Sequence, residues 1–465
     1  MSRVLVICTD LVQRAMAGPG IRALELARVL AVHQPVTLAI PRATDMHEPQ
    51  LAIVSYGTDG QPLAALLAAA DVVVVQGAVY QQYPEIAASA LPLAIDLYDP
   101  LLLEGLDLVL HGDADDDTAA ARIEVYRALT EAQLRRGDFF FCATERQRDY
   151  WLGALTALGR VTPALVRSTD RELRGLIDLV PSGIASTPPL ARQPVLRGAH
   201  PAIGQDDIVL LWAGGLWDWF DPEILVRAVA ELARTRPTVR LVFLAGARPN
   251  PDGEPIRTRP AARARALADE LGVLDRTVIF VEHWVPYAAR GAYLAEADVG
   301  VSAHQAGVET RFAFRTRLLD YLWARLPYVG SAGDSLAAAY AAAGGGLLVE
   351  PGDLGGLIDA LRRMVDEPVL RADCRAAIES MTAHYHWDTV ARPLAAFCAA
   401  PRRTGAVPVE EAWQTQIAAL ETTLRERDAY IAHVEREYQR ASTYAQHLEA
   451  AANGGLRGVI RRLRG

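Results

Sequence analysis

Short apolar runs alternate with longer amphipathic stretches along most of this 465-residue chain. The runs are rich in β-branched and aromatic residues, whereas the stretches between them repeat their apolar residues with the period of a helix. This alternation is typical of parallel sheets, because each pair of parallel strands has to be joined by a crossover, usually a helix. We therefore expect an α/β protein with doubly wound sheets. Strands are expected near Val4–Cys8, Val36–Ile40, Val72–Val75, Leu93–Ile95, Phe139–Phe141, Ile177–Val180, Ile208–Trp212, Arg240–Leu244, Val278–Val281, Val299–Val301, Tyr328–Val329 and Leu347–Val349.

A proline-rich stretch divides the alternation into two series. Pro188, Pro189 and Pro194 are followed by Gly198 and Pro201. This composition is typical of a linker between domains. The sequence therefore predicts a first domain at residues 1–187, a linker at 188–204 and a second domain at 205–385.

The last part of the chain has a different pattern. Residues 410–452 contain no proline or glycine, and their apolar residues recur at alternating steps of four and three, interrupted only at Arg427. This heptad spacing predicts a coiled coil that joins copies of the chain, with a long helix packed on its own domain as the alternative. Residues 453–465 are basic and hold no acid. For this tail we keep two interpretations, contact with an anionic membrane surface and a solvated terminus.

Charge and cysteine content disfavour several classes of function. The net charge of -9 argues against nucleic acid as a partner. All 47 basic residues are arginine, which excludes a lysine Schiff base and a phosphate-binding lysine. The four cysteines are far apart, so neither a metal site nor a disulfide framework is expected. The first residues have the pattern of a strand rather than of a leader, and we expect a cytoplasmic protein, peripheral on the inner face of the membrane if the tail docks there.

Two pairs of glycines stand between a strand and a helix. Gly18 and Gly20 follow the first strand, and Gly214 and Gly215 follow the first strand of the second series. Glycine lets the backbone approach a ligand closely, and a helix amino terminus favours a phosphate group. The first pair lacks the third glycine of a dinucleotide fingerprint, so nicotinamide binding is disfavoured. The alternative for both pairs is an ordinary turn.

Aromatic and basic residues follow the next strands of the second series. Trp217 comes just after the second glycine pair and can stack on a planar ring or a sugar, with sealing of a cleft as its alternative role. Arg248 follows the next strand, and His283 and Trp284 follow the one after it. Because the carboxyl ends of parallel strands meet at one edge, we expect these side chains to gather where ligands bind in such sheets.

The segment Glu309–Pro327 places charged residues against an apolar helix at the same edge. Arg311, Arg315 and Arg317 are candidates for phosphate binding, because guanidinium groups match phosphate oxygens in pairs. Thr316 is grouped with them as a residue of the ligand site. The segment therefore predicts a site for an anionic ligand.

The order of these motifs resembles the family-four glycosyltransferases. The resemblance rests on the Gly-Gly turn, the sequence His-Trp-Val-Pro-Tyr, the strand that ends at Ser302 and the helix that begins Arg-Leu-Leu-Asp at Arg317. It extends over roughly residues 1–400. It implies the GT-B fold, in which two Rossmann-like domains face a cleft, with a nucleotide sugar on the second and an acceptor on the first. It also implies that a helix at 386–400 returns to the first domain.

The resemblance assigns roles within the helix that begins at Arg317. The family's lysine and the glutamate three residues after it correspond to Arg317 and Asp320, which are expected to contact the nucleotide. The family's first glutamate corresponds to Phe312, and Glu309 is the nearest carboxylate that can take its place. The alternative for Arg317 and Asp320 is a salt bridge within the helix.

Asp96 and Asp99 stand at the end of a first-domain strand, a region where relatives often have a catalytic histidine. One of the two is expected to take the proton of the acceptor hydroxyl or to hold the sugar. The alternative is a capping or turn aspartate before Pro100.

Together these features predict transfer of a sugar from a nucleotide diphosphate sugar to a glycan or lipid-linked acceptor in cell-envelope assembly. The resemblance implies retention of the anomeric configuration, and no metal or other cofactor is expected. Two alternatives remain. One is a nucleotide-sugar 2-epimerase of the same fold, and the other is a non-catalytic scaffold joined by its coiled coil.

Overall fold

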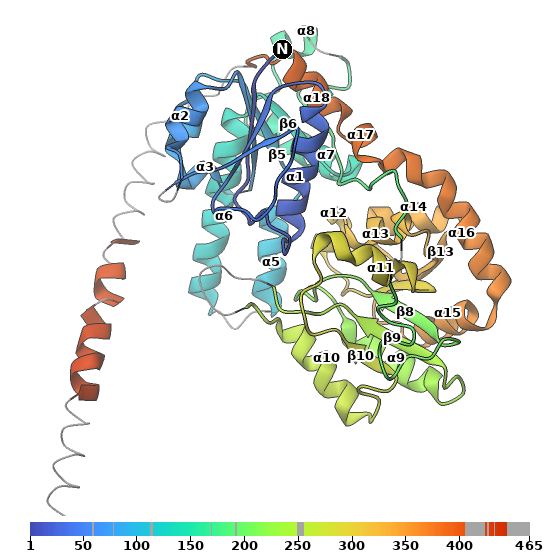
Figure 1. Ribbon diagram of the computed structural model, residues 1–465. Coiled ribbons are helices and arrows are strands. Elements are labelled where there is room, and N and C mark those ends of the chain that lie inside the picture. The colour runs from blue at the N-terminus through green and yellow to red at the C-terminus, as the bar shows by residue number, and fades with distance from the viewer. Residues whose placement is uncertain are drawn as a thin grey trace, which may run out of the picture. The chain divides into compact units, whose positions relative to one another are not determined.

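The computed structural model of the protein describes residues 1–57, 60–77, 79–111, 115–168, 170–190, 193–248, 255–404, 424–425, 427–431 and 433–443. The chain forms two units, Met1–Val407 and Pro408–Gly465. The larger unit contains two parallel sheets, each covered by helices (Figure 1). This arrangement confirms the prediction of two doubly wound α/β domains.

The first domain is built on a seven-stranded parallel sheet with the order β3-β2-β1-β4-β5-β6-β7. Its strands are β1 (Val4–Ile7), β2 (Val36–Ile40), β3 (Ala52–Ser55), β4 (Val72–Gln76), β5 (Leu93–Asp96), β6 (Phe139–Cys142) and β7 (Ile177–Leu179). Its helices are α1 (Gly18–Ala31), α2 (Leu63–Ala68), α3 (Val79–Gln82), α4 (Pro84–Ala88), α5 (Leu101–His111), α6 (Asp116–Arg136), α7 (Glu145–Ala157) and α8 (Pro163–Ser168).

The second domain is built on a six-stranded parallel sheet with the order β10-β9-β8-β11-β12-β13. Its strands are β8 (Ile208–Trp212), β9 (Val239–Phe243), β10 (Val278–Phe280), β11 (Val299–Ser302), β12 (Tyr328–Ser331) and β13 (Gly346–Val349). Its helices are α9 (Pro222–Ala233), α10 (Arg259–Glu270), the 3₁₀ turn η1 (Tyr287–Ala289), α11 (Arg290–Ala295), α12 (Val308–Phe312), α13 (Arg317–Trp323), α14 (Ser335–Ala342), α15 (Leu354–Asp366) and α16 (Pro368–Thr382).

Both faces of each sheet are buried, which explains the continuous apolar runs of the strands. In β1, Val4 and Val6 belong to one core cluster, whereas Leu5 and Ile7 belong to the cluster on the opposite face. Successive side chains of a strand point to opposite faces, so a strand covered by helices on both sides needs apolar residues throughout. The sequence analysis missed β3, because this edge strand is only partly buried and its short Ala-Ile-Val-Ser sequence gives a weak signal.

Each sheet has one point at which the strand order reverses. In the first sheet β1 pairs with both β2 and β4, and in the second sheet β8 pairs with both β9 and β11. The helices that follow the two strands on either side of this point lie on opposite faces, which leaves a crevice at the carboxyl ends. The fold therefore offers two crevices, one at β1 and β4 and the other at β8 and β11.

The chain returns to the first domain after α16. The turn η2 (Ala383–Tyr385) leads into α17 (Trp387–Val390) and α18 (Arg392–Ala399), which lie against the first domain in Figure 1. Trp387 and Phe397 are buried in the core cluster that contains β1, and the Phe397 ring stacks on Phe139 with centroids 4.9 Å apart. The last helices therefore complete the core of the domain that the chain formed first.

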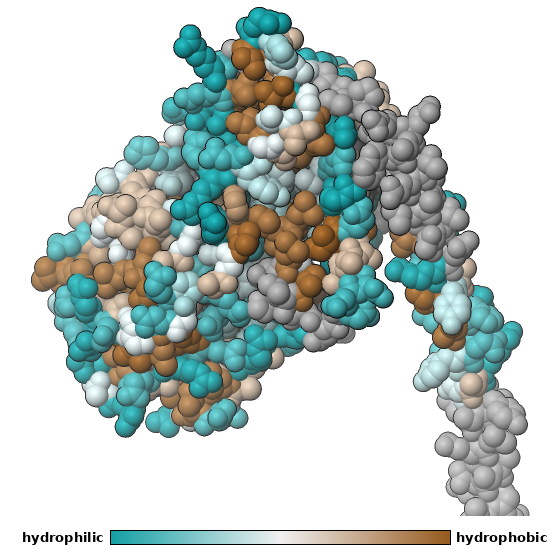
Figure 2. Space-filling model, turned by 180° about the vertical axis from the view of Figure 1, so that it is seen from behind, coloured by the Kyte–Doolittle hydropathy of each residue, from teal (hydrophilic) through white to brown (hydrophobic). Residues whose placement is uncertain are grey.

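The surface alternates in polarity. Figure 2 shows brown apolar patches separated by teal hydrophilic side chains on the face opposite to that of Figure 1. In the part of the chain that the structure describes, no helix is both long and apolar enough to cross a membrane.

The smaller unit contains the whole of the predicted coiled coil. Its described residues, 424–425, 427–431 and 433–443, are helical and almost all exposed. The rest of the predicted coiled coil at 410–452, and the whole basic tail at 453–465, lie outside the described residues. The predicted oligomer and membrane contact therefore stay predictions.

Replacing Phe397 with alanine is expected to lower the free energy of unfolding by about 3 to 5 kcal/mol, because the change opens a cavity in the first-domain core. Val369→Ala, at a side chain of α16 that is 70% exposed, serves as the control and should change it by less than about 0.5 kcal/mol. Urea denaturation of both variants measures the difference. Equal effects would show that α18 contributes nothing to the first-domain core.

Candidate functional site

Arg317 lies at the crevice of the second sheet. It is the first residue of α13, and its side chain reaches the carboxyl ends of both strands that flank the reversal point. Nε donates to the Ala213 carbonyl at 2.6 Å, Nη2 donates to the Gly215 carbonyl at 2.6 Å, and Nη1 donates to Ser302 Oγ at 3.2 Å. The guanidinium thus ties the turn after β8 to the end of β11.

The guanidinium of Arg317 is a buried charge whose three hydrogen-bond acceptors in the described structure are all neutral. It lies 4.2 Å from the ring centre of Trp212 and 4.3 Å from that of Phe220. Burial lowers its pKa to about 10, and the positive charge of Arg315 acts in the same direction. Both effects mean that an anion placed beside Arg317 would be strongly favoured.

The glycine turn allows this arrangement. Gly214 has a φ of 104°, a backbone conformation that is strained for any residue with a side chain. A β-carbon on Gly214 would meet Arg317 Nη2 only at an ordinary contact distance of 3.8 Å. The backbone conformation, rather than a lack of space, therefore requires glycine at position 214.

Arg315 and Glu309 form a second buried group beside Arg317. Arg315 Nη2 donates to Glu309 Oε2 at 2.5 Å, and both side chains are nearly inaccessible to solvent. Arg315 Nε is buried without a hydrogen-bond partner. Arg315 is therefore paired with a carboxylate, whereas Arg317 is not. Arg311 and Thr316 of the same segment are exposed.

Asp320 pairs with a residue that the sequence analysis did not consider. Arg290 Nε donates to Asp320 Oδ1 at 2.8 Å, and the Arg290 guanidinium lies 3.8 Å from the ring centre of Tyr287. The structure thus does not contain the alternative that we considered, a salt bridge between Arg317 and Asp320. Arg317 remains available for another anion.

The other expected residues of the second domain are placed around this centre. Trp217 packs on the second-domain core, and its ring centre lies 6.2 Å from that of Trp219. His283 is exposed and its Nε2 lies 3.2 Å from the Tyr293 hydroxyl, whereas the indole N–H of Trp284 is buried without an acceptor. Trp284 therefore keeps an unused donor.

Several contacts join the two domains. Arg248 Nη2 donates to Asp10 Oδ2 at 2.7 Å, and the Tyr287 hydroxyl donates to Glu25 Oε1 at 3.1 Å. Further contacts are the Gln147 amide with the Phe312 carbonyl at 2.7 Å and Arg146 Nη1 with the Gly333 carbonyl at 3.1 Å. The domains are therefore in contact, with the carboxyl ends of strands from both sheets contributing residues to the boundary.

The first glycine pair has a packing role that the sequence analysis did not foresee. Both glycines lie in the first turn of α1 rather than in a turn before it. A β-carbon on Gly20 would lie 2.1 Å from the Leu11 carbonyl oxygen, whereas one on Gly18 would meet open space. Gly20 is therefore required because α1 packs closely on the loop after β1.

Asp96 is held by a buried arginine. Arg22 of α1 donates from Nε to Asp96 Oδ2 at 2.6 Å and from Nη2 to Oδ1 at 2.9 Å. The backbone N–H of Tyr98 also donates to Oδ1, and Arg22 donates further to the Val180 carbonyl at 2.7 Å. Both oxygens of Asp96 are therefore occupied, which fits a positioning residue better than a base.

Asp99 belongs to a group of carboxylates at the domain boundary. Burial raises its pKa to about 7, and the negative charges of Asp96 and Glu309 add to that effect. Burial also raises the pKa of Glu104, with Asp99 and Glu309 again contributing. A carboxyl group that titrates near neutral pH is suited to receive or return a proton.

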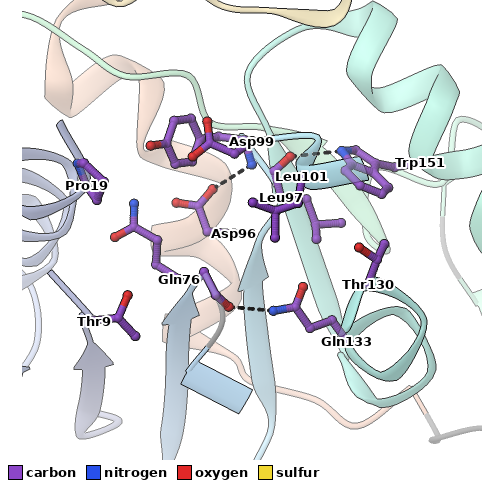
Figure 3. A pocket seen from close by; sticks show the side chains of 12 residues that line it. Thr9, Pro19, Gln76, Asp96, Leu97, Asp99, Leu101, Thr130, Gln133 and Trp151 are labelled. Carbon is purple, nitrogen blue, oxygen red and sulfur yellow. Dashed lines mark hydrogen bonds between the residues drawn. The ribbon is translucent and has the colours of Figure 1, made fainter. Parts of the chain in front are cut away.

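Asp99 and Asp96 line a cavity of about 90 Å³ at the crevice of the first sheet. Figure 3 shows the two aspartates together with Thr9 from the end of β1 and Gln76 from the end of β4. The cavity thus occupies the reversal point of the first sheet, where doubly wound folds bind ligands.

Four residues at the two crevices were missed by the sequence analysis. Arg22 and Gln76 lie at the first crevice, Arg290 binds Asp320, and His304 follows β11. Burial lowers the pKa of His304 to about 4, and its Nε2 lies 3.0 Å from the Ala332 carbonyl. Gln76 stands at the end of a strand and His304 just after one, so the sequence could have indicated both as site residues. Arg22 and Arg290 could not be found in this way, because their partners are distant in sequence.

Comparison with known proteins identifies the second domain. Residues 207–367 match a family model described as "Glycosyl transferases group 1". The second domain is therefore similar to the group 1 glycosyl transferases. The matched residues include the Gly-Gly turn, Arg290, Arg315, Arg317 and Asp320, so the whole of the second crevice falls within the match.

Curated relatives cover part of the chain. A D-inositol 3-phosphate glycosyltransferase from Acidothermus cellulolyticus is 31% identical over 238 residues, which are 48% of this chain and 50% of the relative. A protein of the same name from Stackebrandtia nassauensis is 29% identical over 245 residues. The chain thus spans about half the length of the curated relatives that it matches.

Solved structures share the fold over most of the chain. WaaG, a glycosyltransferase involved in lipopolysaccharide biosynthesis, is 16% identical, covers 86% of this chain and is itself fully covered, with a TM-score of 0.60. The sucrose-phosphate synthase of Thermosynechococcus elongatus is 17% identical, covers 85% of this chain and is 98% covered, with a TM-score of 0.58. These similarities confirm the GT-B fold.

The raised pKa of Asp99 predicts how stability depends on pH. Its pKa is about 7 in the folded protein and about 3.9 in the unfolded chain, so the folded protein binds more protons between these values. The contribution of this group to stability is therefore present at low pH and is lost as the pH rises toward 7. Asp99→Asn, which stays neutral, should gain stability relative to the parent protein by roughly 1 to 3 kcal/mol between pH 5 and pH 8.

Chemical denaturation at several pH values measures this difference. Asp71→Asn serves as a control, because the pKa of Asp71 is shifted in the opposite direction. A hydrogen bond from Arg3 lowers the pKa of the Asp71 carboxyl group to about 2. If the free energies of unfolding of Asp99→Asn and of the parent protein differ by the same amount from pH 5 to pH 8, the pKa of Asp99 is not raised in the folded protein.

Proposed function

We propose that this protein transfers a sugar from a nucleotide diphosphate sugar to an acceptor hydroxyl. The observation that carries the proposal is Arg317, a buried cation with neutral partners at the crevice of a group 1 glycosyl transferase domain. A buried charge is costly unless an opposite charge compensates it. The diphosphate of a donor supplies that charge.

In the proposed transfer, residues of the second domain bind the leaving diphosphate and a residue of the first domain accepts the proton of the acceptor. The bond between the anomeric carbon and the diphosphate breaks, and its electron pair leaves with the diphosphate. Arg317 stabilises the growing negative charge, and the unpaired Arg315 Nε is a further donor. The acceptor oxygen forms the new bond to the anomeric carbon. Asp99 is the base to which we assign its proton, because both oxygens of Asp96 are already occupied.

Asp320 and Trp284 complete the proposed donor site. Asp320 stands three residues after Arg317 on α13, where it offers a carboxylate to ribose hydroxyls while Arg290 holds it in place. The unused indole donor of Trp284 is a further contact for the nucleotide. One structural neighbour, HepE of Anabaena, was solved with UDP and glucose; it is 13% identical to this chain and has a TM-score of 0.58.

Several finer features stay part of the proposal. Retention of configuration, Glu309 as the carboxylate near the transferred sugar and independence from a metal all come from the resemblance to family-four enzymes. A role in cell-envelope glycan or glycolipid assembly, self-association through residues 410–452 and membrane contact by residues 453–465 are likewise proposed.

A panel of UDP-, GDP- and ADP-sugars tests the activity. Release of the nucleoside diphosphate together with transfer of the sugar to an acceptor is the expected result. Release together with a free sugar inverted at C2 would identify a 2-epimerase. Absence of release, with no donor raising the melting temperature, would identify a scaffold and overturn the proposal.

Arg317→Met is expected to weaken donor binding at least tenfold, because the change removes the compensating charge at the diphosphate. Arg22→Met is the matched comparison, since it also removes a buried arginine but leaves the Asp96 carboxylate unpaired. It should cost about 3 to 5 kcal/mol of stability, whereas Arg317→Met should cost less. Thermal unfolding with and without nucleoside diphosphates separates the two effects, and an unchanged ligand shift in Arg317→Met would argue against a diphosphate at this position.

A further inference from the structure

The cavity at the first crevice contains a side chain whose hydrogen bonds are unmade. Gln76 ends β4 and is 7% exposed, and both its Oε1 and its Nε2 are buried without a partner. An amide buried in this way costs free energy, and such groups are rare in folded proteins. Gln76 therefore calls for an explanation beyond packing.

The neighbours of Gln76 explain why it finds no partner within the protein. Gln76 pairs in register with Asp96 on the adjacent strand β5, so the two side chains leave the sheet on the same face. Asp96 is the residue opposite Gln76 on β5, but its two oxygens already accept hydrogen bonds from Arg22 and from the Tyr98 backbone N–H. Asp96 thus makes its hydrogen bonds with other partners, and the Gln76 side chain lines the cavity.

The other glutamine of the cavity behaves differently. Gln133 of α6 donates from Nε2 to the Gly77 carbonyl at 2.6 Å, so its amide has a structural role. Figure 3 shows this bond as a dashed line, whereas the Gln76 amide, drawn beside Pro19 and Asp96, has none. The cavity therefore contains one amide used by the protein and one available to a ligand.

Size and charge limit what this ligand can be. A cavity of about 90 Å³ has room for about three water-sized groups, which is one edge of a small ring rather than a whole nucleotide. The charge of Arg22 is neutralised by Asp96, and Asp99 adds either no charge or a negative one. A phosphate or carboxylate would meet no available cation among the residues that line this cavity. Neutral hydroxyl groups fit the small volume and need no cation. An amide can donate a hydrogen bond to one hydroxyl group and accept one from the next.

We infer that Gln76 and Asp99 bind an uncharged edge of a polyhydroxyl acceptor through adjacent hydroxyl groups. Gln76 forms hydrogen bonds with two adjacent hydroxyl groups, and Asp99 faces the hydroxyl group that reacts. The inference rests on the proposed function for the identity of the ligand as an acceptor. It adds that the part of the acceptor inside the cavity carries no phosphate, and that Gln76 determines specificity for hydroxyl groups at this point.

Two matched variants separate a ligand-binding amide from a structural one. Methionine has nearly the shape of glutamine but cannot form its hydrogen bonds. Gln76→Met removes an unpaired buried amide, so its melting temperature should equal or exceed that of the parent protein. Gln133→Met leaves the Gly77 carbonyl without its donor, so its melting temperature should fall by about 2 to 4 °C. A fall in Gln76→Met as large as that in Gln133→Met would overturn the inference.

Ligand binding supplies the second measurement. Saturation-transfer NMR and calorimetry are performed with myo-inositol, methyl α-D-glucopyranoside and inorganic phosphate as probes. The parent protein should bind at least one of the two neutral polyols, and Gln76→Met should bind it about 5- to 100-fold more weakly. Absence of polyol binding in the parent protein, or equal binding in Gln76→Met, would overturn the inference.

Nucleoside diphosphates distinguish this outcome from failure of the proposed function. UDP, GDP and ADP are tested for their effect on the melting temperature of the parent protein and of Gln76→Met. If a nucleotide stabilises both equally while polyol binding is lost only in the variant, donor and acceptor sites are separate as proposed. If polyols bind but no nucleotide does, the cavity assignment stands and the transferase proposal fails.

Discussion

A buried arginine stands at the crevice of each sheet, and the presence of a carboxylate partner distinguishes the two crevices. Arg22 binds Asp96 through two hydrogen bonds and also reaches the Val180 carbonyl, so one guanidinium joins α1 to the ends of β5 and β7. Arg317 joins α13 to the ends of β8 and β11 through neutral acceptors only. Each crevice therefore depends on a cation for its shape, but only the second has positive charge left for a ligand.

This difference gives the two crevices different chemistry. The second crevice, with Arg317 beside a glycine turn, suits a diphosphate. In the first crevice the internal ion pair leaves an amide and a titrating carboxyl group, which suit neutral hydroxyls. Contacts such as Arg248 with Asp10 join the two domains, so the proposed donor site and the proposed acceptor site belong to domains that touch each other.

Much of the fold was predictable because buried parallel strands need apolar residues on both faces. The edge strand β3 escaped prediction, since an edge is only partly covered and its sequence is less apolar. Of the candidate site, the sequence placed Asp96 and Asp99 at a strand end, and the resemblance indicated Arg317 and Asp320; their roles stay predictions. It could not predict that Arg290 holds Asp320 or that Gln76 lacks a partner, because both facts depend on segments that meet only in the folded chain.

The two α/β series follow from the amino-acid sequence alone, as does the use of arginine for every basic residue. These are properties of local pattern and composition, which hydrophobic burial translates directly into strands and helices. Which charges are compensated depends on how the chain folds. Hydrogen bonds and ion pairs form between groups a few ångströms apart in space, whereas most partners of Arg22 and Arg317 are at least 74 residues away from them along the chain. That choice of partners leaves Arg317 and Gln76 available to ligands.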